Sequence, residues 1–211
     1  MTHLIWDFDG TLYDTYPQMT HAMQATLRGF GREIDGAEAR ALMKKTVFYA
    51  FGVYAERFGL DRLALQKAFF EEHSRVSRFI PMAGMAECLR ATLALGCRHY
   101  LFTHRDNGAI RQLTADGLSD CFTDTVTRED GFADKPAPDA ILHLIQKHGM
   151  VPAQTFMIGD REIDVLSGHA AGTNGILFDP DGYEPAVTAE YRVRSMAEIT
   201  AIVRALHARE G

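Results

Sequence analysis

The sequence predicts an α/β fold in which a doubly wound parallel sheet is accompanied by a small α-helical domain. Two observations lead to this prediction. From Cys97 onward, short apolar segments of strand length alternate with amphipathic helical patterns, which is typical of β-α-β units. Residues 15–80 break that alternation directly after the first apolar segment, because they show helical periodicity and no convincing strand.

Several segments have the length and the β-branched or aromatic content of buried strands: residues 3–8, 98–102, 123–127 and 154–158. Helical patterns follow the later strands at residues 106–116, 138–148 and 161–171. A further strand at residues 174–178 and a helix at residues 195–208 complete the expected α/β domain. Strands joined by such helices run parallel, so their carboxyl ends are expected at one edge of the sheet.

The insertion is long enough for a separate helical bundle of about four helices. One of its patterns places large apolar side chains three or four positions apart, at Val47, Phe51, Tyr54 and Phe58. The predicted domains are residues 1–14 with 81–211, and residues 15–80. Since the insertion leaves the first strand and returns to the second, we expect it to cap the carboxyl ends of the strands, where ligands bind in open α/β sheets.

Composition narrows the class of protein further. The 211 residues carry a net charge of −6 without clustered lysine or arginine, which argues against nucleic-acid binding. No apolar run approaches the ~18 residues of a membrane helix, and the first strand begins at residue 3, which leaves no room for a signal peptide. Three cysteines without CxxC spacing indicate neither a disulfide framework nor a zinc site. We therefore expect a cytoplasmic monomer or weak homodimer whose partner is a small molecule.

The segment DFDGT at residues 7–11 is the strongest local motif. Asp7 and Asp9 directly follow a strand, and two carboxylates in a crevice of low dielectric constant repel each other unless a cation intervenes. Gly10 allows the backbone to approach a ligand closely, and the Thr11 hydroxyl is placed to orient Asp9. The motif therefore predicts a cation at this edge of the sheet.

Polar residues also follow the later strands. Thr103 ends the second strand, Lys135 lies in the loop DKPAPD, and Asp160 and Asp164 belong to GDREID after the fourth strand. Because parallel strands end at one edge, these side chains should converge on the crevice that holds Asp7. Carboxylate oxygens are the ligands that Mg²⁺ prefers, and an ammonium group pairs with phosphoryl oxygens. The set predicts a site for Mg²⁺ and a phosphate group.

With these motifs in this order, the chain resembles the haloacid dehalogenase superfamily. The likeness is to the branch with an α-helical cap inserted after the first motif, which includes phosphoglycolate phosphatases and β-phosphoglucomutases. It rests on DFDGT, the helical insertion, LFTH at residues 101–104, the lysine of DKPAPD and GDREID, and it covers nearly the whole chain. The resemblance implies a Rossmann-like core and Mg²⁺-dependent phosphoryl transfer through an aspartyl phosphate.

The resemblance also implies a role for each motif residue. Asp7 attacks phosphorus, and Asp9 protonates the leaving oxygen, later activates water, and ligates the metal through its backbone carbonyl. Lys135 helps to neutralise the phosphoryl group. The expected phosphate ligands are Gly10, Thr11, Thr103 and His104, of which His104 replaces the asparagine frequent in the family. The expected metal ligands are Asp7, Asp9, Asp160 and Asp164, with Asp164 acting directly, through a water, or on Lys135.

Several chemistries share this fold, and the first motif helps to separate them. Dehalogenases and phosphonatases of the superfamily lack the second aspartate, so the presence of Asp9 argues against both. Sugar-phosphate mutases keep it but carry a hinge histidine that DTYPQM at residues 14–19 lacks. A phosphatase for a small phosphorylated metabolite is therefore the first prediction. A sugar-phosphate mutase is the second, and a catalytically idle binding module the third.

Substrate selection is expected in the helical insertion, because the core handles only the phosphoryl group. Lys44, Lys45 and Thr46 lie at a junction between two expected helices. Lys45 is predicted to contact a second anionic group of the substrate. Two adjacent lysines cannot share one helix face, and exposure of both to solvent stays the alternative.

Overall fold

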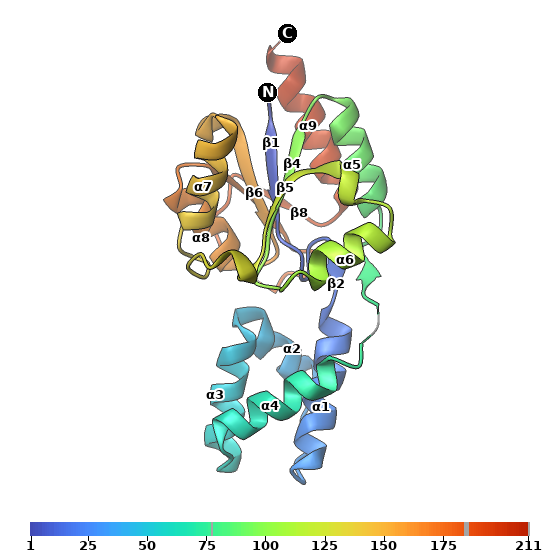
Figure 1. Ribbon diagram of the computed structural model, residues 1–211, viewed down its shortest axis with the longest axis vertical. Helices are drawn as coiled ribbons and strands as arrows, with labels where there is room; N and C mark the ends of the chain where they lie inside the picture. The colour runs from blue at the N-terminus through green and yellow to red at the C-terminus, as the bar shows by residue number, and fades with distance from the viewer. Residues whose placement is uncertain (77, 184–185, 211) are drawn as a thin grey trace. The chain divides into compact units, whose positions relative to one another are not determined.

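The computed structural model describes residues 1–76, 78–183 and 186–210, with side chains through residue 208 (Figure 1). The chain divides into two compact units. The first consists of Met1–Tyr13 and Pro81–Gly211, and the second of Asp14–Ile80. The two segments that connect the units pair as a two-stranded sheet, formed by β2 (Tyr13–Asp14) and β3 (Ile80–Pro81).

The first unit is built on a parallel sheet of six strands in the order β5-β4-β1-β6-β7-β8. The strands are β1 (His3–Trp6), β4 (Arg98–Phe102), β5 (Phe122–Val126), β6 (Thr155–Gly159), β7 (Asn174–Phe178) and β8 (Tyr191–Val193). The prediction of an α/β protein with a parallel sheet is confirmed. Since β1 lies between β4 and β6, the first motif leaves the middle of the sheet.

Helices cover both faces of this sheet, with α7 and α8 on one side and α5 and α9 on the other (Figure 1). The helices of the unit are α5 (Met85–Ala94), α6 (Gly108–Ala115), α7 (Asp139–His148), α8 (Glu162–Ala170) and α9 (Met196–Glu210). Short 3₁₀ turns occur at Ser119–Cys121, Arg128–Asp130 and Pro152–Gln154. Among the described helices and strands, α5, the edge strand β8 and the two-residue strands β2 and β3 were not predicted.

The sheet is held by apolar burial on both faces. Leu4, Ile5 and Trp6 of β1 are fully buried, as expected for the middle strand of a sheet that helices cover on both sides. One face of the sheet packs against Ile141 and Leu144 of α7 in a continuous apolar cluster. Burial of such side chains contributes about 1.5–3 kcal/mol each, which fixes the strand ends from which the motif residues extend.

The second unit is a bundle of four helices: α1 (Tyr16–Gly29), α2 (Gly36–Lys45), α3 (Val47–Phe58) and α4 (Arg62–His73). Its core contains Phe51 and Tyr54 of the predicted apolar pattern, while Val47 and Phe58 pack partly buried against it. The Thr46 hydroxyl accepts a hydrogen bond from the Tyr49 N–H at 2.9 Å and so begins α3. The function of this unit as a cap stays a prediction.

Within the described ranges, no helix is both long and apolar enough to cross a bilayer.

Candidate active site

The motif residues are positioned by backbone hydrogen bonds at the carboxyl ends of neighbouring strands. The N–H of Asp7, one residue beyond β1, donates to the carbonyl oxygen of Ile158 in β6 at 2.8 Å. The N–H of Thr103, one residue beyond β4, donates to the carbonyl oxygen of Val126 in β5 at 3.0 Å. These bonds continue the parallel ladders by one residue, so both side chains are fixed at the same edge of the sheet.

Lys135 is buried between two carboxylates. Its Nζ lies 2.6 Å from Asp7 Oδ1 and 2.7 Å from Asp164 Oδ1, and it donates a third hydrogen bond to the carbonyl oxygen of Phe102 at 2.9 Å. The side chains of all three charged residues are at most 1% exposed. Three donors thus meet three acceptors, which is the full hydrogen-bonding capacity of an ammonium group.

The two carboxylates beside Lys135 differ in their charge preference. Burial raises the pKa of Asp7 to about 7, against the opposing effect of Lys135 and with a further contribution from the Asp164 charge. Burial acts in the same direction on Asp164, but Lys135, Arg161 and the hydrogen bond from the Arg161 N–H outweigh it and hold the pKa of Asp164 below its ordinary value. Of these two carboxylates, Asp7 is therefore the one whose ionised form an additional cation would stabilise more.

Three buried aspartates could hold such a cation. Asp7, Asp160 and Asp164 each offer one oxygen, and these oxygens lie within 4.8 Å of one another. Asp7 Oδ2 is buried and makes no hydrogen bond with any described residue, which is destabilising unless a ligand supplies a partner. Hard oxygen ligands of this kind suit Mg²⁺ or another hard divalent ion, so the residues fit the predicted metal. The backbone carbonyl of Asp9 stays a predicted ligand.

The position of Asp164 depends on a glycine. A Cβ atom at Gly159, the last residue of β6, would lie 2.2 Å from Cβ and Cγ of Asp164. Only glycine leaves room there for the first turn of α8 to bring Asp164 under Lys135.

Asp9 is held by a residue that the sequence analysis missed. Arg105 Nε lies 2.8 and 2.9 Å from the two oxygens of Asp9, and Arg105 Nη2 lies 2.6 Å from Asp9 Oδ1. The predicted orientation of Asp9 by Thr11 is not found, because the buried Thr11 hydroxyl makes no hydrogen bond with any described residue. Gly10, which lies between Asp9 and Thr11 in the sequence, has φ 74°, a left-handed conformation that glycine adopts without strain.

The residues after β4 form a second set of contacts. Thr103 Oγ1 accepts the Arg105 N–H at 3.1 Å, so its own hydrogen can be donated to a phosphoryl oxygen. His104 Nε2 accepts the Lys135 N–H at 2.9 Å, which places the ring proton of neutral His104 on Nδ1. Burial, with Lys135 and Arg161 nearby, lowers the pKa of His104 to about 4. His104 thus fixes the lysine loop, and its predicted contact with phosphate stays a prediction.

The predicted substrate residue Lys45 lies in the helical unit and is exposed. Its Nζ is 4.9 Å from the centroid of the Tyr49 ring. The buried member of the pair is Lys44, whose Nζ lies 5.3 Å from the centroid of the Tyr16 ring. A role of Lys45 in substrate binding therefore stays a prediction, and the structure shows that the two lysines have different surroundings.

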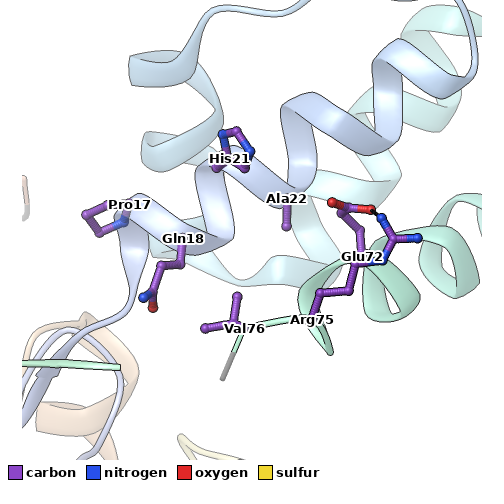
Figure 2. A pocket seen from close by; sticks show the side chains of 7 residues that line it. All are labelled: Pro17, Gln18, His21, Ala22, Glu72, Arg75 and Val76. Atoms are coloured by element: carbon purple, nitrogen blue, oxygen red, sulfur yellow. Dashed lines mark hydrogen bonds and ion pairs between the residues drawn. The ribbon is translucent and has the colours of Figure 1, made fainter. Parts of the chain in front are cut away.

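The helical unit also contains a pocket of about 380 Å³ between α1 and the end of α4 (Figure 2). Its lining residues are Pro17, Gln18, His21, Ala22, Glu72, Arg75 and Val76. Glu72 and Arg75 form an ion pair with each other at its rim. None of the predicted catalytic or metal residues lines this pocket.

Comparison with known proteins places this geometry in a family. The model of the family described as haloacid dehalogenase-like hydrolase matches residues 4–178, which include every motif residue of the α/β unit. The chain belongs to this family. Membership confirms the resemblance found from the motifs and agrees with a hydrolase of the phosphatase type.

Named relatives of this family member are phosphatases. A phosphoglycolate phosphatase of Psychrobacter arcticus is 27% identical over 181 residues, which are 80% of this chain and 79% of that protein. A phosphoglycolate phosphatase of Rhodospirillum rubrum is 30% identical over 187 residues, covering 80% and 76% of the two chains. The crystal structure of a hydrolase from Streptococcus pneumoniae TIGR4 matches 84% of this chain and 92% of its own, with 30% identity and a TM-score of 0.65. The prediction of a phosphatase is confirmed at this level.

Proposed function

We propose that this family member is a Mg²⁺-dependent phosphatase that hydrolyses the phosphate monoester of a small metabolite through an aspartyl phosphate on Asp7. The observation that carries the proposal is the contact of Lys135 with Asp7 and Asp164 beside a third buried aspartate, Asp160. A buried cation and a cluster of hard oxygen ligands at one strand edge are the parts that phosphoryl transfer requires.

The reaction needs two displacements at phosphorus. In the first, an oxygen of Asp7 forms a bond to phosphorus while the bond to the ester oxygen breaks, and Asp9 gives its proton to the departing alkoxide. In the second, a water attacks the phosphoryl group on Asp7, Asp9 takes the proton of that water, and inorganic phosphate leaves. Free Asp7 and protonated Asp9 are regenerated, so protons and bonds balance.

The other residues act on charge and orientation. Lys135 compensates the negative charge of Asp7 and of the incoming phosphoryl oxygens, and the Thr103 hydroxyl donates to one of those oxygens. Asp7, Asp160 and Asp164 would hold Mg²⁺, which supplies electrostatic stabilisation of the transferring phosphoryl group.

Hydrolysis is favoured over the mutase reaction. The curated relatives reported above are phosphatases, and DTYPQM lacks the hinge histidine expected of a mutase. A mutase returns the phosphoryl group to a sugar, so it releases little inorganic phosphate. The two reactions are therefore separated by measuring phosphate release.

The test is phosphate release from a panel of phosphorylated metabolites, with Mg²⁺ and with a chelator. We expect metal-dependent release by the native protein and a loss of at least a thousandfold in Asp7→Asn. The exposed Asp120→Asn, far from the cluster in sequence, is the control and should behave as the native protein. Stoichiometric trapping of phosphate on native protein, detected by mass after acid quench, should be absent in Asp7→Asn. Release that survives this substitution would exclude Asp7 as the nucleophile.

A further inference from the structure

Arg105 is more firmly fixed than a surface arginine. Its N–H donates to Thr103 Oγ1 at 3.1 Å, and its carbonyl oxygen accepts the N–H of Arg128 at 2.8 Å. Its guanidinium carbon lies 5.5 Å from the centroid of the Phe8 ring. The side chain is 19% exposed. Arg105 therefore presents a pre-positioned guanidinium group at the edge of the predicted site.

The guanidinium group faces the carboxylate of Asp9. Three nitrogen-oxygen distances between 2.6 and 2.9 Å join the two side chains and engage both oxygens of Asp9. Such a pair is the stronger kind of hydrogen bond because both partners are charged and the two planar groups match. Neither phosphoryl transfer nor metal binding by the aspartate cluster gives Arg105 a function.

This contact conflicts with the proposed role of Asp9. An acid that protonates the ester oxygen must bring one of its own oxygens within about 2.6–3.2 Å of that atom. In the structure both oxygens of Asp9 are engaged by Arg105. A ligand that offers the guanidinium group another anion would therefore free Asp9 for this approach and would keep the partly buried cation paired, since a cation without a partner is destabilising there.

We propose that Arg105 is a specificity-determining residue that exchanges Asp9 for a carboxylate on the leaving group of the substrate. This inference rests on the proposed phosphatase function. The substrate class is a phosphate ester of a 2-hydroxy carboxylic acid. Arg105 binds its carboxylate, and Asp9 is released toward the ester oxygen.

The reach of the side chains restricts the leaving group. In a 2-hydroxy acid the carboxyl carbon is two bonds from the ester oxygen, about 2.5 Å away with ordinary bond lengths and angles. Asp9 must approach that ester oxygen, and Arg105 already lies within 3 Å of Asp9. A carboxylate next to the ester carbon therefore falls where the guanidinium group can bind it in the same two-pronged manner. An anion at the far end of a long leaving group does not fall within reach of the guanidinium group.

A matched pair of substrates tests the inference. 2-Phosphoglycolate carries the carboxylate, and 2-hydroxyethyl phosphate has a neutral hydroxymethyl group in its place. The native protein should show a higher kcat/KM for the first. In Arg105→Gln this value should fall about 10- to 100-fold, the range for a hydrogen-bonded charge pair, while the value for the neutral ester should not fall, because Asp9 then has no guanidinium group to leave. Arg111→Gln, which alters an arginine that is 73% exposed on α6, should leave both values unchanged.

A binding measurement without turnover provides a second readout. Glycolate should raise the Tm of the native protein in the presence of phosphate and Mg²⁺, and it should not raise the Tm of Arg105→Gln. Arg105→Lys keeps the charge without the planar fork, so it should restore less than half of the lost preference for the carboxylate. This variant also serves if Arg105→Gln does not fold.

The outcomes separate the inference from the function on which it rests. An equal fall of kcat/KM for both esters would assign Arg105 to the phosphoryl group or to folding and overturn the inference alone. An unchanged preference in Arg105→Gln would overturn it as well. No phosphate release from any ester by the folded native protein would overturn the proposed function and, with it, the role of Arg105.

Discussion

Removal of the Lys135 ammonium group is the sharpest test of the buried charges. Lys135→Met keeps a long side chain but leaves Asp7 and Asp164 buried without the cation that lies 2.6 and 2.7 Å from them. Breaking a buried ion pair by removing one partner typically costs about 3–5 kcal/mol. We expect the free energy of unfolding to fall by this amount at pH 8 in a chelator. Urea titration followed by the fluorescence of Trp6, the single tryptophan and a buried residue of β1, measures it.

The pH dependence of this loss has a defined sign. Burial already raises the pKa of Asp7 to about 7, and removing Lys135 raises it further. Below that pKa the folded variant takes up a proton, which neutralises the carboxylate, so the destabilisation should be smaller at pH 6 than at pH 8.

An exposed ion pair of similar length is the control. Lys147 Nζ lies 2.7 Å from Asp124 Oδ2, but the Lys147 side chain is 51% exposed. Lys147→Met should therefore lower the free energy of unfolding by less than about 1 kcal/mol. If Lys135→Met is no more destabilising than Lys147→Met, the argument from burial is wrong.

Three further predictions follow from single sites. Burial lowers the pKa of His99 to about 4. Between that pH and about 6.5 the unfolded chain therefore binds one more proton at this residue than the folded protein does. The free energy of unfolding should fall by roughly 2 kcal/mol from pH 6.5 to pH 5 on account of His99. The difference between native and His99→Gln in urea titrations at the two pH values measures it, and parallel curves would refute it. Gly159→Ala, whose Cβ would overlap Asp164, should lower turnover at least tenfold, whereas Gly29→Ala, whose Cβ meets no atom within 4 Å, should not. Mg²⁺ at about 100 times its Kd should stabilise the native protein by roughly 2.7 kcal/mol, as seen from Tm, and Asp160→Asn should lose that gain; an equal rise in both proteins would remove Asp160 from the metal site.

The site residues that could be placed from the sequence are those whose positions are set by the ends of strands. Asp7 and Thr103 each follow a strand that contains β-branched or aromatic residues. Because parallel strands end at one edge of the sheet, the convergence of these two residues follows from the topology. Lys135 lies in a loop well beyond β5 and has a long side chain, so its place beside Asp164 was predicted from the motif DKPAPD and not from a strand end. Short side chains next to a strand have little freedom, and their position can therefore be inferred from the chain alone.

Arg105 could not be predicted in this way. It lies two residues beyond Thr103, where an arginine is usually a solvated residue of a loop. The long side chain can reach many places, and its contact with Asp9 depends on the ring of Phe8 and on the backbone bond from Arg128. The charged sequence HRD directly after a motif threonine was the available signal.

The missed elements of the fold have physical reasons too. The strand β8 has only three residues, of which one is buried, so it carries no clear alternation. The choice between Lys44 and Lys45 depends on the rotation of α2, which adjacent residues in a sequence do not reveal.

The charges of the crevice give a reason why metal, phosphate and Arg105 would act together in the proposed mechanism. The described side chains include four carboxylates and three cations: Asp7, Asp9, Asp160, Asp164, Lys135, Arg105 and Arg161. With all of them ionised the crevice is negative and repels a phosphate dianion. A divalent cation reverses that sign, and the dianion can then enter. If a substrate carboxylate takes Arg105, the guanidinium group no longer engages the oxygens of Asp9, which can then turn toward the ester oxygen. In the proposed mechanism, the same binding event would therefore select the leaving group and free its acid.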